Sequence, residues 1–132
     1  MSKVLDFLNK AGTFYLATCD GDQPKVRPLG MAFEMDGKVT FGVGTFKDVY
    51  KQLEKNPKVE VVALGEQGHW LRYTGKAVLI KDESKAAAVV AANPFLQKIY
   101  NEKTGYKLGL FYLEDATAVD IPMMGPGENL LD

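Results

Sequence analysis

The chain has 132 residues, of which 46% are hydrophobic and 25% charged, a balance typical of one soluble globular domain. Its formal charge of -1 supplies no general field for a polyanion, so we expect no nucleic-acid partner. The only cysteine, Cys19, and the only histidine, His69, exclude an internal disulfide and a metal site built from several of these residues.

The N-terminal segment predicts a short helix rather than a targeting sequence. Residues 2–11 place apolar side chains at helical spacing, with Ser2 as the N-cap and Gly12 as the stop. Asp6 and Asn9 interrupt the apolar residues, which excludes a signal peptide or a membrane span there. Together with the single cysteine, this pattern predicts a cytoplasmic protein without a membrane partner.

The following segment predicts antiparallel strands. Residues 13–18 and 25–34 are expected to form a hairpin, and a tight turn at 36–37 leads into a third strand over 38–43. We expect these three strands to pair as a meander. Pro28 interrupts the second strand and indicates an edge, a bulge or a place where the backbone faces a ligand.

A candidate anion site follows the third strand. Glycines at 42 and 44 are expected to leave one face of the strand open, and a helix over 47–55 ends before Pro57. Basic residues at a helix start oppose the helix dipole unless an anion binds there. The candidate donors are Arg27, Thr45, Lys47, Lys51 and Gln52. A plain solvated helix face is the alternative interpretation of the two lysines.

The second half of the chain continues the sheet. We predict strands at 58–64, 69–80, 108–113 and 117–121, helices at 83–92 and 94–100, and an irregular tail over 122–132. Gly75 is expected to bend the long strand. Trp70 and Arg72 could contact a planar ligand, with a core position as the alternative for the tryptophan.

The predicted elements favour one fold class. Six or seven strands with mostly short connections indicate a single antiparallel β-barrel with flanking helices, an α+β arrangement spanning residues 1–132. The regular helical crossovers of a parallel sheet are missing from the first half. Neither a Gly-x-Gly-x-x-Gly fingerprint nor a Walker-type phosphate loop occurs in the sequence.

Several short motifs, in order along residues 1–121, resemble one protein family. They are Phe14-Tyr-Leu-Ala-Thr18, Asp22-Gln-Pro-Lys-Val-Arg-Pro28, Asp36-Gly-Lys38, Lys47 to Gln52, Asn56-Pro-Lys-Val-Glu60 and Trp70-Leu-Arg-Tyr-Thr-Gly75. The pattern is similar to that of the pyridoxamine 5'-phosphate oxidase-like FMN-binding split-barrel proteins, and most similar to their small nitroimidazole-resistance-like branch.

The resemblance implies a homodimer that binds FMN in the groove between two barrels. It implies that Arg27, Pro28 and Leu29 line the flavin, that Thr45, Lys47, Lys51 and Gln52 hold the phosphate, and that Trp70 and Arg72 border the groove from the partner subunit. The expected activity is that of a pyridoxamine-phosphate-oxidase-like or nitroreductase-like oxidoreductase acting on a small planar molecule, with NAD(P)H as reductant and no catalytic protein side chain.

Two other interpretations belong to a different functional class. The chain could be a flavin- or haem-binding module without turnover, and in the haem version His69 would serve as a lone axial ligand. A barrel that has lost its ligand is the third interpretation.

Overall fold

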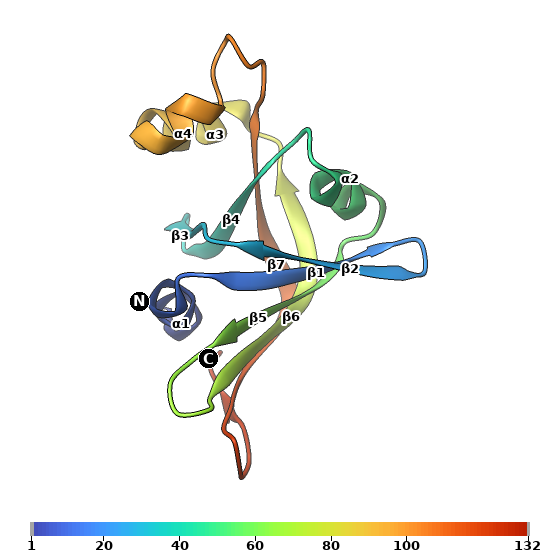
Figure 1. The fold of residues 1–132 in the computed structure, drawn as a ribbon, viewed down its shortest axis with the longest axis vertical. Coiled ribbons are helices and arrows are strands. Elements are labelled where there is room, and N and C mark those ends of the chain that lie inside the picture. Colours follow the sequence, from blue (N-terminus) through green and yellow to red (C-terminus); the bar gives the residue numbers. More distant parts are fainter. Residues whose placement is uncertain (1, 132) are drawn as a thin grey trace.

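The computed structural model describes residues 2–131, which form one antiparallel sheet and four α-helices (Figure 1). The strands are β1 (Phe14–Asp20), β2 (Gln23–Leu29), β3 (Ala32–Met35), β4 (Lys38–Gly44), β5 (Lys58–Leu64), β6 (Trp70–Ile80), β7 (Leu108–Ile121) and β8 (Glu128–Asn129). The helices are α1 (Lys3–Ala11), α2 (Asp48–Lys55), α3 (Glu83–Ala91) and α4 (Pro94–Ile99).

The strand order is β2-β1-β5-β6-β7-β4-β3, with β8 added to β7. The predicted antiparallel sheet and the β1–β2 hairpin are therefore confirmed. The predicted turn at 36–37 and the pairing across it are confirmed, because β3 pairs with β4. The predicted three-stranded meander is wrong, because the chain leaves the sheet at residues 30–31, so that β2 and β3 lie at opposite ends of the strand order. Pro28 lies in edge strand β2, where a missing backbone N–H costs no hydrogen bond to a further strand.

The core lies inside the curved sheet and is closed by two amphipathic helices. The rings of Phe14 and Phe111 pack against Phe41, with ring centroids 5.6 and 5.2 Å away. Leu8 of α1 and Leu53 of α2 are almost fully buried against this cluster. Burying a side chain of this size contributes roughly 1.5–3 kcal/mol, so packing on the sheet holds both short helices in place.

The long strands β6 and β7 bend at Gly75, as predicted. Their pairing register shifts between Thr74 and Lys76, which marks a bulge. A Cβ atom at Gly75 would lie 3.0 Å from the Glu114 carbonyl oxygen and 3.1 Å from Leu113 Cβ. A side chain at position 75 would therefore press against the opposite strand, which favours glycine there. Beyond the bend β7 runs on without a break, whereas the sequence predicted two separate strands.

The bend gives the molecule two distinct ends (Figure 1). Helices α3 and α4 lie at one end, between β6 and β7 in the chain, and the turn at 65–69 lies at the other. The tail, predicted to be irregular, contains the two-residue strand β8, which pairs with Val119 and Asp120. Within residues 2–131, no helix is both long enough and apolar enough to cross a membrane.

Candidate functional site

A groove of about 810 Å³ lies where β2, β4 and the start of α2 meet. Its lining contains five residues that the sequence predicted for a cofactor site: Arg27, Pro28, Leu29, Lys47 and Gln52. They come together because β2 is an edge strand, while β4 delivers the chain directly into α2. Lys47 is the N-cap residue of α2 and makes no side-chain capping bond, because an ammonium group can only donate and the first helical N–H groups need an acceptor.

A buried hydrogen-bond network holds the arginine of the groove. Arg27 Nη1 donates to Thr18 Oγ1 at 2.7 Å, and its Nη2 donates to Gln52 Oε1 at 2.8 Å. The Thr18 hydroxyl in turn donates to the same Gln52 oxygen at 2.6 Å. Because Gln52 Oε1 accepts both bonds, its amide nitrogen is left to donate, and this nitrogen bonds no other residue within 2–131.

The charges of the groove favour an anion. Its lining carries three cations, Lys25, Arg27 and Lys47, against two carboxylates, Asp20 and Asp48. Burial lowers the pKa of Arg27, an effect that the charge of Asp48 partly opposes. A partly desolvated guanidinium gains from an opposite charge placed beside it. The groove therefore has an excess of positive charge in a chain whose formal net charge is -1.

The two glycines of β4 do not open the strand as expected. Both line the groove, but a Cβ atom at Gly42 would lie 2.5 Å from Met31 Sδ, and one at Gly44 would lie 2.6 Å from the Phe46 ring. Side chains of this chain thus already fill the space that the sequence assigned to a ligand. The absence of a side chain at Gly44 allows Phe46 to lie across the strand, where it stacks on Tyr106.

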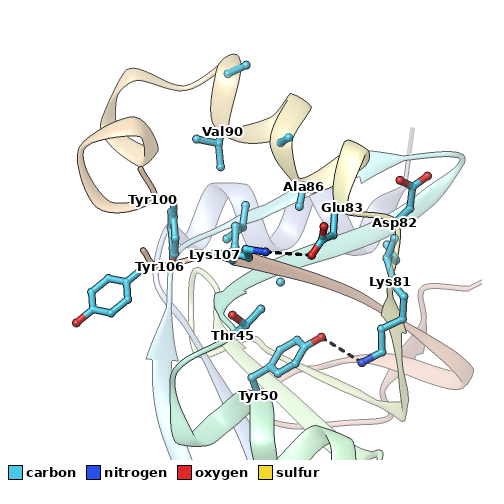
Figure 2. Close-up of a pocket in the computed structure, with 15 residues that line it drawn as sticks. Thr45, Tyr50, Lys81, Asp82, Glu83, Ala86, Val90, Tyr100, Tyr106 and Lys107 are labelled. Carbon is cyan, nitrogen blue, oxygen red and sulfur yellow. Dashed lines mark hydrogen bonds and ion pairs between the residues drawn. The ribbon is translucent and has the colours of Figure 1, made fainter. Parts of the chain in front are cut away.

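Two predicted phosphate donors lie outside the groove. Lys51 lines a neighbouring cavity of about 480 Å³ together with Cys19 and Lys55. Thr45 lines a third cavity, on the other side of α2, which is shown in Figure 2. Residues 45, 47 and 51 therefore face three different spaces, because the chain turns into a helix between them.

Trp70 and Arg72 lie on the outer face of the sheet. The Arg72 guanidinium lies over the Trp70 ring, 4.9 Å from its centroid, and its Nε is 2.7 Å from Glu60 Oε1. Arg72 of β6 is paired with Val62 of β5, Val62 with Tyr15 of β1, and Tyr15 with Pro28 of β2, so these four residues form one row across the sheet. This row spans three strand spacings, roughly 14 Å, so within one chain neither residue lines the groove.

His69 lies apart from the groove. Its Nδ1 is 2.8 Å from Asp120 Oδ1, which fixes the ring against β7. It lines a cavity of about 550 Å³ near the turn at 65–69, and this cavity shares no lining residue with the groove.

Sequence reasoning missed Thr18 and Tyr100. Thr18 is 2% exposed and lies on the same inward side of β1 as Phe14 and Leu16, so the two-residue period of the strand marked it as a buried polar residue. Tyr100 follows α4 and lines both the groove and the cavity of Figure 2. Only the tertiary fold brings it there.

Comparison with known proteins identifies the family. A family model described as pyridoxamine 5'-phosphate oxidase matches residues 1–114. A NimC/NimA family protein from Clostridium acetobutylicum is 33% identical, with a TM-score of 0.85 over 97% of this chain and 89% of that chain. No functionally curated protein matches the sequence.

More distant structures share the fold. A protein related to general stress protein 26, of the pyridoxinephosphate oxidase family and also from Clostridium acetobutylicum, is 14% identical with a TM-score of 0.69, covering 94% of this chain and 88% of its own. HupZ from Group A Streptococcus is 18% identical with a TM-score of 0.67, covering 98% of both chains. The predicted split-barrel fold is confirmed, and the chain belongs to the pyridoxamine 5'-phosphate oxidase-like FMN-binding split-barrel family.

Proposed function

We propose that the protein is an FMN-dependent oxidoreductase that acts on a small planar molecule, with a nicotinamide nucleotide as reductant. The observation that carries this proposal is the groove in which Arg27, Lys47 and Gln52 converge beside Pro28 and Leu29. Family membership supports the choice of cofactor.

The residues of the groove fit FMN. A phosphomonoester carries a charge of about -1.5 to -2 at neutral pH, which suits a lining with an excess of positive charge. A volume of about 810 Å³ lies within the usual range for cofactor sites. In this assignment Arg27, Lys47 and the free amide nitrogen of Gln52 hold the phosphate, and the backbone of Pro28 and Leu29 lies beside the ring system.

The chemistry of the proposed reaction belongs to the cofactor. When bound, FMN supplies the capacity to accept and return reducing equivalents. The protein binds the phosphate, and the Thr18 hydroxyl keeps the Arg27 guanidinium in position before the ligand arrives. Walls formed by Val43 and Val49 exclude water from the inner part of the groove.

A homodimer completes the proposed site. The outer face of the sheet exposes large apolar side chains, with Tyr15 39%, Val26 67% and Leu64 65% accessible. Apolar residues grouped on one face are typical of a protein interface. We assign this face to a second copy of the chain, which would bring Trp70 and Arg72 of the partner subunit towards the groove that neither reaches within one chain.

The test begins with the absorbance spectrum of the purified protein and a titration with FMN. NADH or NADPH is then added without oxygen, and a nitro-aromatic or a quinone is supplied as acceptor. Sustained turnover supports the oxidoreductase. Flavin that binds and bleaches without turnover assigns the chain to the non-catalytic flavin-binding class, and a colourless protein that takes up no FMN overturns the proposal.

A further inference from the structure

The α3 cavity, which is the one that Thr45 lines, has a volume of about 680 Å³ and lies between α3 on one side and the start of β7 with α2 on the other (Figure 2). Its lining shares only Tyr100 with the proposed FMN groove, among the described residues. Ala86 and Val90 project into it from α3, and Thr45 and Tyr50 face it from the opposite side (Figure 2). None of the roles assigned to the groove accounts for this space.

Helix α3 is apolar and only partly buried, with Ala86, Val89 and Val90 at the margin of a small second core cluster. Its residues 86–91 are all alanine or valine, yet no residue of the helix is buried. Ala86, Ala87, Val90 and Ala91 line the cavity. An apolar surface that borders a cavity and remains uncovered is typical of a ligand site, because a bound apolar molecule removes that surface from water.

The charges around the cavity cancel. Lys107 Nζ pairs with Glu83 Oε1 at 3.2 Å, and Lys81 Nζ lies 3.5 Å from Glu54 Oε2 (Figure 2 draws the first pair). The lining itself carries two cations, Lys81 and Lys107, and two carboxylates, Asp82 and Glu83, in contrast to the positive groove. Nothing in this balance favours an anionic ligand, and an uncharged molecule enters without breaking an ion pair.

The remaining polar groups are hydroxyls on otherwise apolar walls. Tyr50 and Tyr100 contribute aromatic surface, whereas the Tyr106 ring stacks on Phe46 and points away from the cavity (Figure 2). Burial raises the pKa of Tyr100, so its phenol stays uncharged at neutral pH. The hydroxyls of Thr45 and Tyr100 donate no hydrogen bond to another residue within 2–131. They can bond an oxygen atom of a flat ligand whose faces pack on the tyrosine rings and on α3.

We propose that this cavity binds an uncharged, flat aromatic molecule of one or two rings that carries a hydroxyl or carbonyl oxygen. The site is separate from the FMN groove and does not depend on a flavin. Its test is therefore independent of the proposed function, and either can fail without the other.

The probe is 1-naphthol, titrated into the full-length chain labelled for NMR. We expect saturable binding below about 1 mM, with intermolecular contacts to the methyl groups of Ala86, Val90 and Leu108. Two related compounds define the class: 1-naphthoate carries a charge and cyclohexanol lacks the aromatic ring. Both are expected to bind at least about tenfold more weakly.

A matched pair of variants on α3 locates the site. Ala86→Leu places a larger side chain in the cavity and should raise the dissociation constant of 1-naphthol by about tenfold or more. Ala88→Leu adds the same side chain at an exposed position that does not line the cavity, and should leave binding unchanged. If Ala86→Leu does not fold, the map of contacts in the unmodified chain decides the question.

Four results would overturn the proposal. They are contacts of 1-naphthol with residues outside the cavity, equal binding of either related compound, no saturable binding, and displacement of 1-naphthol by FMN. The last result would show that the cavity and the flavin share one site.

Discussion

The guanidinium of Arg27 donates to the side-chain oxygen of Gln52 at 2.8 Å, and this bond joins edge strand β2 to helix α2 across the wall of the groove. The two residues are far apart in sequence and belong to elements that share no strand pairing. Their contact fixes the position of the one arginine of the groove before any ligand binds. A ligand that uses Arg27 therefore meets a side chain that has already lost much of its freedom.

The first prediction concerns the hydroxyl that completes this contact. Thr18→Val keeps the shape of the side chain but removes the bonds of Thr18 to Arg27 and Gln52, so the free energy of unfolding should fall by about 1–3 kcal/mol. Urea denaturation measures the change. Thr117→Val, at an exposed position of β7, is the control and should have little effect. Equal stability of the two variants would contradict the structural role of the Thr18 hydroxyl.

The second prediction separates the two lysines that the sequence grouped together. Lys47 lines the groove and Lys51 the neighbouring cavity, so Lys47→Ala should raise the dissociation constant of FMN by about tenfold, and Lys51→Ala by less than about threefold. Fluorescence titration measures both. Lys3→Ala, on α1, controls for the loss of a surface charge. A larger effect at Lys51 would move the phosphate into the neighbouring cavity.

The third prediction tests the proposed dimer face. Val26→Asp puts a charge on the outer face of β2. In a symmetric dimer both subunits contribute this charge to the interface, so the variant should sediment as a monomer at micromolar concentration. Phe95 is equally exposed, at 67%, but lies on α4 away from this face. Phe95→Asp should therefore remain a dimer. A native chain that is itself monomeric would refute the assignment of the face.

The fourth prediction concerns pH and the ion pair between α3 and the β3–β4 turn. The Lys85 ammonium donates to Asp36 at 2.7 Å, which lowers the pKa of Asp36 and raises the pKa of Lys85. The contribution of Asp36 is fully present above its ordinary pKa of about 3.9, and is lost as the pH falls through its lowered pKa in the folded protein. The contribution of Lys85 is present below about pH 10.4 and is lost as the pH rises through its raised pKa.

Lys85→Gln should accordingly lower the thermal midpoint at pH 7 by about 1–3 °C, a small change because the pair is exposed to solvent. The difference from the native chain should shrink below about pH 3.9. Calorimetry across this pH range provides the measurement. Lys98→Gln is the control, because Lys98 is exposed and forms no ion pair within residues 2–131. A difference that is constant from pH 7 to pH 3 would contradict the assignment.

Local sequence patterns predicted most elements of the fold. Helical spacing predicted α1, Pro57 predicted the end of α2, and the glycine at position 75 predicted the bend of β6. The pairing of β4 with β3 was predicted from the turn at 36–37, but its pairing with β7 could not be predicted in the same way. Residues 38–43 carry no local signal for a second partner, and their pairing with β7 depends on burial against a strand more than 60 residues away in the chain.

The candidate site was predicted in composition but not in arrangement. The pattern of donors identified Arg27 and Gln52, which the fold brings into contact. It could not separate Thr45, Lys47 and Lys51, because the direction of each side chain depends on where the helix begins. The stacking of Phe46 on Tyr106, which fills the space beside Gly44, involves two loops that only the folded sheet places together.

The bend at Gly75 divides β6 and β7 into two arms that serve different parts of the molecule. One arm leads to α3, α4 and the α3 cavity, and the other leads to His69 and the tail. Because the corner itself is fixed by a glycine in contact with the opposite backbone, loops at either end can change in length without altering the frame between them. Such a corner lets two surfaces of one small barrel diversify independently, while the groove keeps its geometry.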